Sequence, residues 1–414
     1  MRPDRLVAPA LGALWTHRGR LPFAWDVLKH GACADCSLGT AGLQHTAPGQ
    51  QLCARRLDRL DRQTAPAFSP RVLAEVAPLK GLSPRALRGL GRIPAPLLRR
   101  AGQTGFAPLS WTDATALVSA RLRDERAQAA WGLRVDPLGM DLESLFQLGR
   151  FVAAMERRER GDLPPLVDLA VPTEERALRA RARDTRGVAT SSTSSVDLAP
   201  GDRALVVSDG DQPLLDDLLA FLRERGVLVQ QAGATDPWPD DVRATLLFGR
   251  AGTVTSLAAG LPLATENADL APLSAAYLVG ERAGREVTGL ERVPFRVHQA
   301  AFLDPSMLDA ATEAVLLVPA STASATPGGG THISDELVAR FAPPVVGAPR
   351  SEARPHWEIP VLVAAHASTD LGDRLAVHDS AELRAALARE RPGLAGVLDL
   401  AAPGDGFRLP SPLP

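Results

Sequence analysis

The sequence predicts an α/β fold with mostly parallel sheet units and flanking helices, behind a small irregular N-terminal domain that carries the cysteines. Short apolar runs alternate with amphipathic stretches between residues 203 and 320, which is typical of parallel strands covered by helices. All three cysteines lie in the N-terminal region, which is rich in proline, glycine and arginine. We therefore expect three parts, at residues 1–107, 108–320 and 321–414.

Two helices are expected ahead of the first strand. Ser110 is a suitable N-cap, with Asp113 at the third helical position and apolar residues at helical spacing behind it. Residues 141–160 form the second predicted helix. Between the cysteines and these helices, the arginine-rich residues 83–102 are expected to form a solvated helical connector.

The apolar and β-branched runs that follow are expected to be strands, with an amphipathic helix over residues 212–226. The serine- and threonine-rich residues 189–202 are expected to form a loop. An Asp/Ser cap begins a last helix within residues 378–393. The strands are expected, in order, at residues 203–208, 227–232, 243–249, 275–280, 292–298 and 313–320.

Composition argues against several classes of partner. The net charge of −2 gives no electrostatic basis for nucleic acid as the main partner. No apolar run reaches the length of a membrane span, and Asp4 comes too early for a secretory signal. Three cysteines, an odd number, argue against a disulfide scaffold and favour a cytoplasmic setting with reduced thiols.

The cysteines carry the strongest chemical signal in the chain. Cys33 and Cys36 form a C-x-x-C pair, and Cys53 follows in the same short region. Thiolates in such an arrangement hold iron–sulfur clusters or zinc. The fourth ligand is one of three candidates or is missing, and ordinary burial as small apolar side chains is the alternative. The three candidates are His30, Asp35 and His45.

The residues around the cysteines resemble a known family. The stretches "LKHGACADCSLGT" and "LCARRL" are similar to the N-terminal pattern of formate-dehydrogenase-alpha-like molybdopterin oxidoreductases. Further motifs similar to those of that family follow in the same order: "FAPLSW" (106–111), "PGGGT" (327–331) and "EARPHWEI" (352–359). The resemblance implies that Cys33, Cys36 and Cys53 hold an iron–sulfur cluster, usually [4Fe-4S]. It also implies that Arg56 lies between this cluster and a pterin.

The same resemblance implies a second cofactor, molybdopterin guanine dinucleotide with molybdenum, bound by residues 108–320. The glycine-rich stretch "LFGRAGTVTS" follows a predicted strand, where glycine lets the backbone approach a phosphate. Its Gly249, Arg250 and Gly252 are the candidate cofactor-binding residues. The implied activity is oxidation of formate or a related small substrate, with electrons leaving through the cluster to a partner protein.

Three departures from the family oppose molybdenum chemistry. In "LPPLVDLAVPT" (163–173), which aligns with the family's molybdenum-ligand segment, Leu169 and Ala170 offer no metal ligand. Asp168 is the local substitute, and we expect it to face solvent or to cap the next helix. The acidic turn "SDGD" (208–211) repels phosphate. The C-terminal β-barrel of the family is expected to be absent.

Two functions therefore stay open, and with them the question of whether the chain is an enzyme. The first is a molybdopterin-dependent, formate-dehydrogenase-like oxidoreductase with an iron–sulfur centre. The second is a non-catalytic relative that serves as an iron–sulfur or structural subunit without molybdenum. A zinc-stabilised binding protein is a third reading. The sequence contains no Ser/His/Asp order, metalloprotease motif or Walker loop that favours another chemistry.

Overall fold

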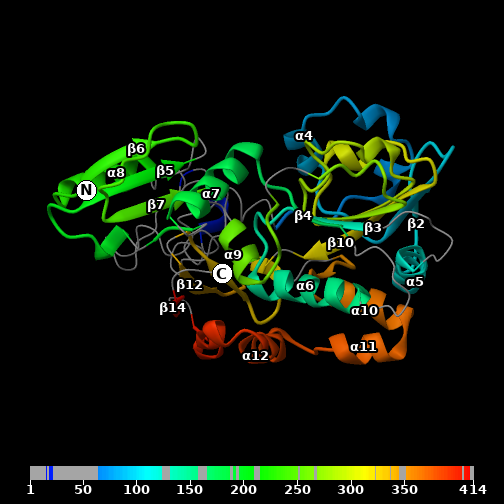
Figure 1. Ribbon diagram of the computed structural model, residues 1–414. Helices are drawn as coiled ribbons and strands as arrows, with labels where there is room; N and C mark the ends of the chain where they lie inside the picture. Colours follow the sequence, from blue (N-terminus) through cyan, green and yellow to red (C-terminus); the bar gives the residue numbers. More distant parts are fainter. Residues whose placement is uncertain are drawn as a thin grey trace.

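The computed structural model describes residues 15, 18–21, 64–123, 131–156, 166–186, 190–192, 195–208, 215–249, 252–264, 268–321, 323–335, 337–344, 351–402 and 405–410. Within these ranges the chain forms three open sheets with helices packed against them (Figure 1). The predicted fold class, parallel sheet units with flanking helices, is confirmed.

The main sheet has the strand order β2-β1-β10-β9-β8-β3-β4, and β13 pairs with the end of β10. Five neighbouring strands, from β10 to β4, run parallel, while β1 and β2 are antiparallel. The bounds are β1 Leu97–Arg100, β2 Ala107–Pro108, β3 Trp131–Val135, β4 Leu166–Leu169, β8 Ala275–Val279, β9 Phe295–Ala300, β10 Ala314–Ser321 and β13 Arg354–Pro355.

Both faces of the main sheet are buried, which explains why its strands are nearly continuous apolar runs. In β8, Tyr277 packs into the core beneath α6 and α10, whereas Leu278 points to the opposite face. In β10, Leu316 and Leu317 likewise pack on opposite faces of the sheet. Helices α6, α10, α11 and α12 lie on one side of the sheet in Figure 1. The helices in the described ranges are α4 Pro84–Gly89, α5 Trp111–Leu122, α6 Leu142–Glu156, α7 Thr173–Arg186, α8 Leu215–Glu224, α9 Thr253–Ala258, α10 Glu358–Ala367, α11 Thr369–Leu375 and α12 Ser380–Glu390.

Two smaller sheets accompany the main sheet. One is parallel, with the order β6-β5-β7, and the other is antiparallel, with the order β11-β12-β14. In β5, Val206 packs with α8 on one face and Val207 packs with α7 on the other. The bounds are β5 Arg203–Ser208, β6 Leu228–Ala232, β7 Ala244–Phe248, β11 Gly330–Ile333, β12 Val338–Ala342 and β14 Gly406–Arg408.

The prediction of a solvated connector at residues 83–102 is wrong. Helix α4 is short, and the chain then enters the main sheet as β1, with Leu97 and Leu98 buried. Two of the arginines that suggested solvent exposure, Arg88 and Arg99, are held by partners. Arg99, for example, donates from Nη1 to the carbonyl of Leu308 (3.0 Å) and lies over the ring of Phe106.

The serine-rich segment is not simply a loop, because it completes the edge of β7. The Ser191 hydroxyl donates to the carbonyl of Leu247 (3.1 Å) and accepts from the Leu247 amide (2.9 Å). The Ser192 amide and hydroxyl bond to Thr245 in the same way. Hydroxyl groups here replace the backbone of a missing neighbouring strand and satisfy buried polar groups.

Replacement of Ser191 by alanine should lower the free energy of unfolding by about 1–3 kcal/mol, because it leaves the buried Leu247 amide and carbonyl without their partner. Urea unfolding followed by circular dichroism measures this change. A variant as stable as the wild type would show that water replaces the hydroxyl and that the serine segment does not support β7.

Candidate functional site: the strand-order reversal of the main sheet

The strand order of the main sheet reverses between β3 and β8. From β3 the chain passes to β4 on one side, while β8, β9 and β10 extend the sheet on the other side. In open α/β sheets, ligands bind outside the carboxyl ends of the strands at such a reversal. The segments that follow β3 and β8 are therefore the first candidates for a functional site.

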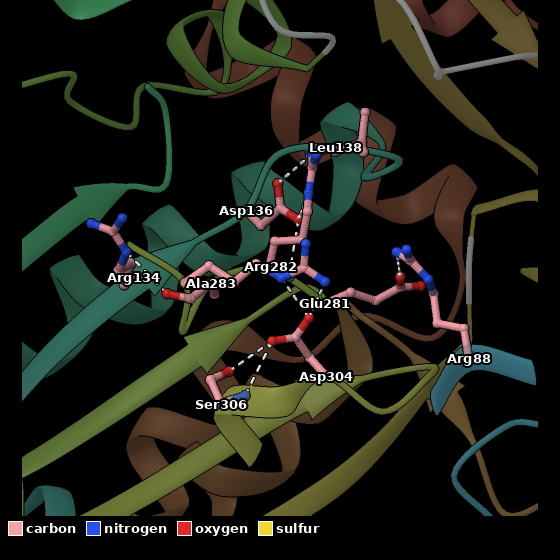
Figure 2. A network of polar contacts seen from close by, with 10 residues as sticks. Arg88, Arg134, Asp136, Leu138, Glu281, Arg282, Ala283, Asp304 and Ser306 are labelled. Atoms are coloured by element: carbon pink, nitrogen blue, oxygen red, sulfur yellow. Dashed lines mark hydrogen bonds and ion pairs between the residues drawn. The ribbon is translucent and has the colours of Figure 1, made fainter. Parts of the chain in front are cut away.

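An ion pair between a buried carboxylate and a partly exposed guanidinium lies at this position. Asp136, directly after β3, accepts from Arg282, directly after β8, through the Arg282 amide (3.2 Å), Nε (3.1 Å) and Nη2 (3.2 Å). The Leu138 amide donates to the same carboxylate (3.3 Å). The Asp136 side chain is 2 % exposed and the Arg282 side chain 23 % exposed. Figure 2 shows Arg282 and Asp136 close together.

The segment after β8 is held on several sides at once (Figure 2). Glu281 pairs with Arg88 of α4 (3.4 Å), and the Ala283 carbonyl accepts from Arg134 Nε (3.0 Å). Arg285 Nε donates to Asp304 (2.6 Å), which also accepts from the Ser306 hydroxyl (3.0 Å). These contacts tie one loop to α4, β3 and the segment after β9, so they fix the polar groups at the strand-order reversal against each other.

The sequence predicts that Asp168 faces solvent or caps the next helix. Asp168 does not face solvent, and it contacts that helix, α7, through the side chain of Arg176. Its side chain is 1 % exposed and lies between Arg134 of β3 and Arg176 of α7. Arg176 Nη2 donates to Asp168 Oδ1 (2.8 Å), and Arg134 Nη1 donates to Oδ2. Because each carboxylate oxygen accepts from a buried guanidinium, Asp168 does not fit the role of a molybdenum ligand. Leu169 and Ala170 lie beside it and carry no donor atoms for a metal.

The glycine-rich turn after β7 contacts a carboxylate of the chain itself. The Gly249 amide donates to Asp335 Oδ2 (2.9 Å), and Asp335 Oδ1 accepts from Arg179 Nη2 (2.9 Å). Gly252 has φ of +89°, and a Cβ atom there would collide with the carbonyl of Pro137. The Gly249 amide, which could otherwise donate to a phosphate group, therefore donates to Asp335. Glycine is required at position 252 by close packing against the loop after β3.

A second buried acidic group lies where α6 begins. Asp141 caps this helix by accepting from the Ser144 amide (2.6 Å). Glu143 accepts from the Thr331 amide (2.8 Å) and hydroxyl (2.9 Å) and pairs with Arg384 of α12 (3.2 Å). The "PGGGT" stretch thus serves to bring β11 against the start of α6.

Burial changes the acidity of two of these carboxyl groups. Desolvation, followed by the charge of Glu143, raises the pKa of Asp141 to about 7. Desolvation also raises the pKa of Asp335 to about 6, although Arg179 opposes this shift. Strongly shifted groups gather at functional sites, but structural ion-pair networks produce the same shifts.

Three of the residues predicted from the sequence, Asp168, Gly249 and Gly252, lie within the residues the structure describes, and five do not. Gly249 and Gly252 have the contacts given above, and their role in cofactor binding stays a prediction. The cluster ligands and both basic residues lie outside the described ranges, namely Cys33, Cys36, Cys53, Arg56 and Arg250. Sequence reasoning missed Asp136 and Arg282, although an acidic residue directly after an apolar strand was a usable signal.

The described ranges contain no group of three or more His, Cys, Asp or Glu side chains placed to hold a metal ion. In the same ranges, none of the helices combines the length and the apolar character that crossing a membrane requires.

Comparison with known proteins leaves the family open. No protein-family model and no curated protein matches the chain. Among solved structures, one match is the X-ray crystal structure of the formyltransferase/hydrolase complex (FhcABCD) from Methylorubrum extorquens in complex with methylofuran. The match has 12 % sequence identity and a TM-score of 0.35, and it covers 67 % of this chain and 98 % of that chain. A likeness this weak carries no argument about function.

The predicted membership of the formate-dehydrogenase-alpha-like molybdopterin oxidoreductases is wrong. No model of that family matches, and the solved structure described above belongs to a formyltransferase/hydrolase complex. The motifs of that resemblance that lie in the described ranges have local structural roles. In "EARPHWEI", the Glu352 carbonyl accepts from Trp111 Nε1 (2.9 Å), and Arg354 lies over the Trp111 ring. Short motifs that meet packing needs of this kind are weak markers of kinship.

Replacement of Asp141 by asparagine should change the pH dependence of stability. Folding raises the pKa of Asp141. Its contribution to the free energy of unfolding is therefore fully present below the unfolded pKa near 3.8 and is lost as pH rises through about 7. Asn caps a helix as well as Asp but does not titrate. Between pH 4 and pH 7, the free energy of unfolding of the variant should therefore increase relative to that of the wild type, by up to about 1.4 kcal/mol per pH unit.

Urea unfolding at a series of pH values measures this difference, and Asp141→Ser is the matched control. Serine also caps without titrating, so its difference from the wild type should have the same slope with a constant offset. A flat difference between wild type and Asp141→Asn across this range would contradict the assignment of a raised pKa to Asp141.

Proposed function

We propose that this chain is a non-catalytic structural subunit whose N-terminal cysteines hold a thiolate-bound metal centre. The observation that carries the first part is the Asp136–Arg282 ion pair. It occupies, with the chain's own side chains, the position at which a sheet of this kind binds a substrate or cofactor. Substrate could reach this crevice only by displacing a carboxylate that accepts from two amides and a guanidinium.

Neighbouring polar groups support the same proposal. Asp168, Asp304 and Asp335 each accept from a guanidinium, and each is buried. A buried ion pair is costly to break once one partner is removed, about 3–5 kcal/mol, so such groups favour a fixed framework. General acid–base catalysis instead needs a group within reach of a substrate proton.

The metal centre rests on the spacing of Cys33, Cys36 and Cys53. Three thiolates in one short region suit an iron–sulfur cluster or zinc. An iron–sulfur cluster would let the subunit pass electrons to a partner protein, whereas zinc would stabilise the N-terminal region. Reduced thiols fit a cytoplasmic protein in either case.

Metal analysis of the purified full chain, with acid-labile sulfide, tests this proposal. We expect iron with sulfide, or zinc, near one centre per chain, and molybdenum below a tenth of that amount. Cys36→Ser should lose most of the metal, because it removes a ligand from a set that is already short of one thiolate. Asp136→Asn, which changes the crevice and leaves the cysteines intact, should keep the metal.

Two results would contradict the proposal. If Cys36→Ser kept the metal content of the wild type, the proposed thiolate-bound centre would be contradicted. If the protein retained a stoichiometric amount of molybdenum after gel filtration, the proposed non-catalytic role would be contradicted. Iron with sulfide favours the electron-transfer form of the proposal, and zinc favours the structural form.

A further inference from the structure

A cavity of about 580 Å³ lies away from the crevice, on the helical side of the main sheet. It is lined by residues of α6, by the segment that ends α9, and by the ends of α11 and α12. Its α6 residues, from Phe146 to Ala154, begin more than one helical turn after Asp141, so they extend along the helix away from the crevice. A volume of this size accommodates a small organic molecule.

The cavity is basic. Arg150, Arg374 and Arg391 line it together with one acidic residue, Glu390. Arg150 Nε pairs with Glu390 (3.3 Å), and Arg374 pairs with the exposed Asp370 outside the lining. Among the described residues, Arg391 has no carboxylate partner. One positive charge at the wall is therefore left unbalanced.

The guanidinium of Arg150 is held in a fixed position. Its Nη2 donates to the carbonyl of Arg374 (2.8 Å) and its Nη1 donates to Gln147 Oε1 (3.0 Å). Three of its five N–H donors are thus used, counting the contact with Glu390, and two are left. A fixed guanidinium with unused donors is suited to an oxyanion, because little conformational entropy is lost on binding.

Small residues keep the cavity open. Gly149 lies inside α6, where glycine lowers helix stability relative to alanine. A Cβ atom there would meet neighbours only at 3.8 Å, which is ordinary contact, so packing does not require a glycine. Ala153 and Ala154 continue the same lining. Apolar contact comes from Phe146 and Leu375.

The ends of helices explain part of this arrangement but not all of it. Arg374 and Arg391 lie at the carboxyl ends of α11 and α12, where basic side chains interact favourably with the helix dipole. This role accounts for the charges. It does not account for a hollow lined by glycine and alanine beneath them.

We propose that this cavity binds a small organic anion, with its oxyanion against Arg391 and Arg150 and its apolar body against Phe146 and Leu375. A carboxylate and a phosphate monoester share the chemistry that these guanidinium groups recognise. The proposal does not rest on the metal centre, and the cavity shares no lining residue with the Asp136–Arg282 ion pair.

Isothermal titration of the full chain at low ionic strength tests the site, with benzoate, phenyl phosphate and neutral benzamide as probes. We expect saturable binding of at least one anion and none of benzamide. Arg391→Ala should weaken that binding at least tenfold, and Arg391→Lys should retain part of it. Ala153→Leu should abolish it by filling the cavity, and because Ala153 is exposed, this change keeps the fold.

Arg389→Ala is the matched control, since Arg389 is exposed on the same helix but does not line the cavity. It should bind as the wild type does. Tighter binding of benzoate assigns the site to carboxylates, and tighter binding of phenyl phosphate assigns it to phosphate esters. Absence of saturable binding of either anion to the wild type would overturn the proposal. So would unchanged affinity in both Arg391→Ala and Ala153→Leu, because the arginines would then serve only the helix ends.

Discussion

A carboxylate buried at the carboxyl edge of the main sheet must have a guanidinium partner, and this constraint organises the rest of the structure. Asp168 shows it most clearly, since it joins Arg134 of β3 to Arg176 of α7. Arg134 also donates to the Ala283 carbonyl, and Arg176 donates to the carbonyl of Ala264 (2.9 Å). A single charge therefore holds together two strands, one helix and two loops.

The same constraint distinguishes the strand-order reversal, where each charge has a partner, from the cavity beside α6. At the strand-order reversal, Asp136 and Arg282 satisfy one another, so the charges of the crevice serve the fold. At the cavity beside α6, the balance differs, because basic side chains outnumber acidic ones and small residues leave space. This contrast is the reason why we propose a structural role for the first place and a ligand for the second.

Much of the fold could be predicted from local sequence, whereas the site could not. The Ser110 cap of α5 and the strand at residues 203–208 depend on neighbouring residues, and both predictions are confirmed. Strands β3 and β4 were not predicted, because each contains a charged residue, Arg134 or Asp168. Sequence alone suggests that such a residue is exposed to solvent, unless its buried partner is known. That partner lies 34 residues away in the sequence, and no periodic pattern connects the two. The described family motifs misled for a similar reason, since "PGGGT" and "EARPHWEI" make packing and hydrogen-bond contacts with distant segments of this chain.

A double-mutant cycle on Asp136 and Arg282 tests the central claim most directly. The free energy of unfolding is measured for the wild type, Asp136→Asn, Arg282→Gln and the double variant. If the ion pair closes the crevice as part of the framework, the coupling energy should lie between about 1 and 3 kcal/mol. A coupling energy below about 0.3 kcal/mol would contradict this account, because Arg282 would then be free to bind a substrate or cofactor.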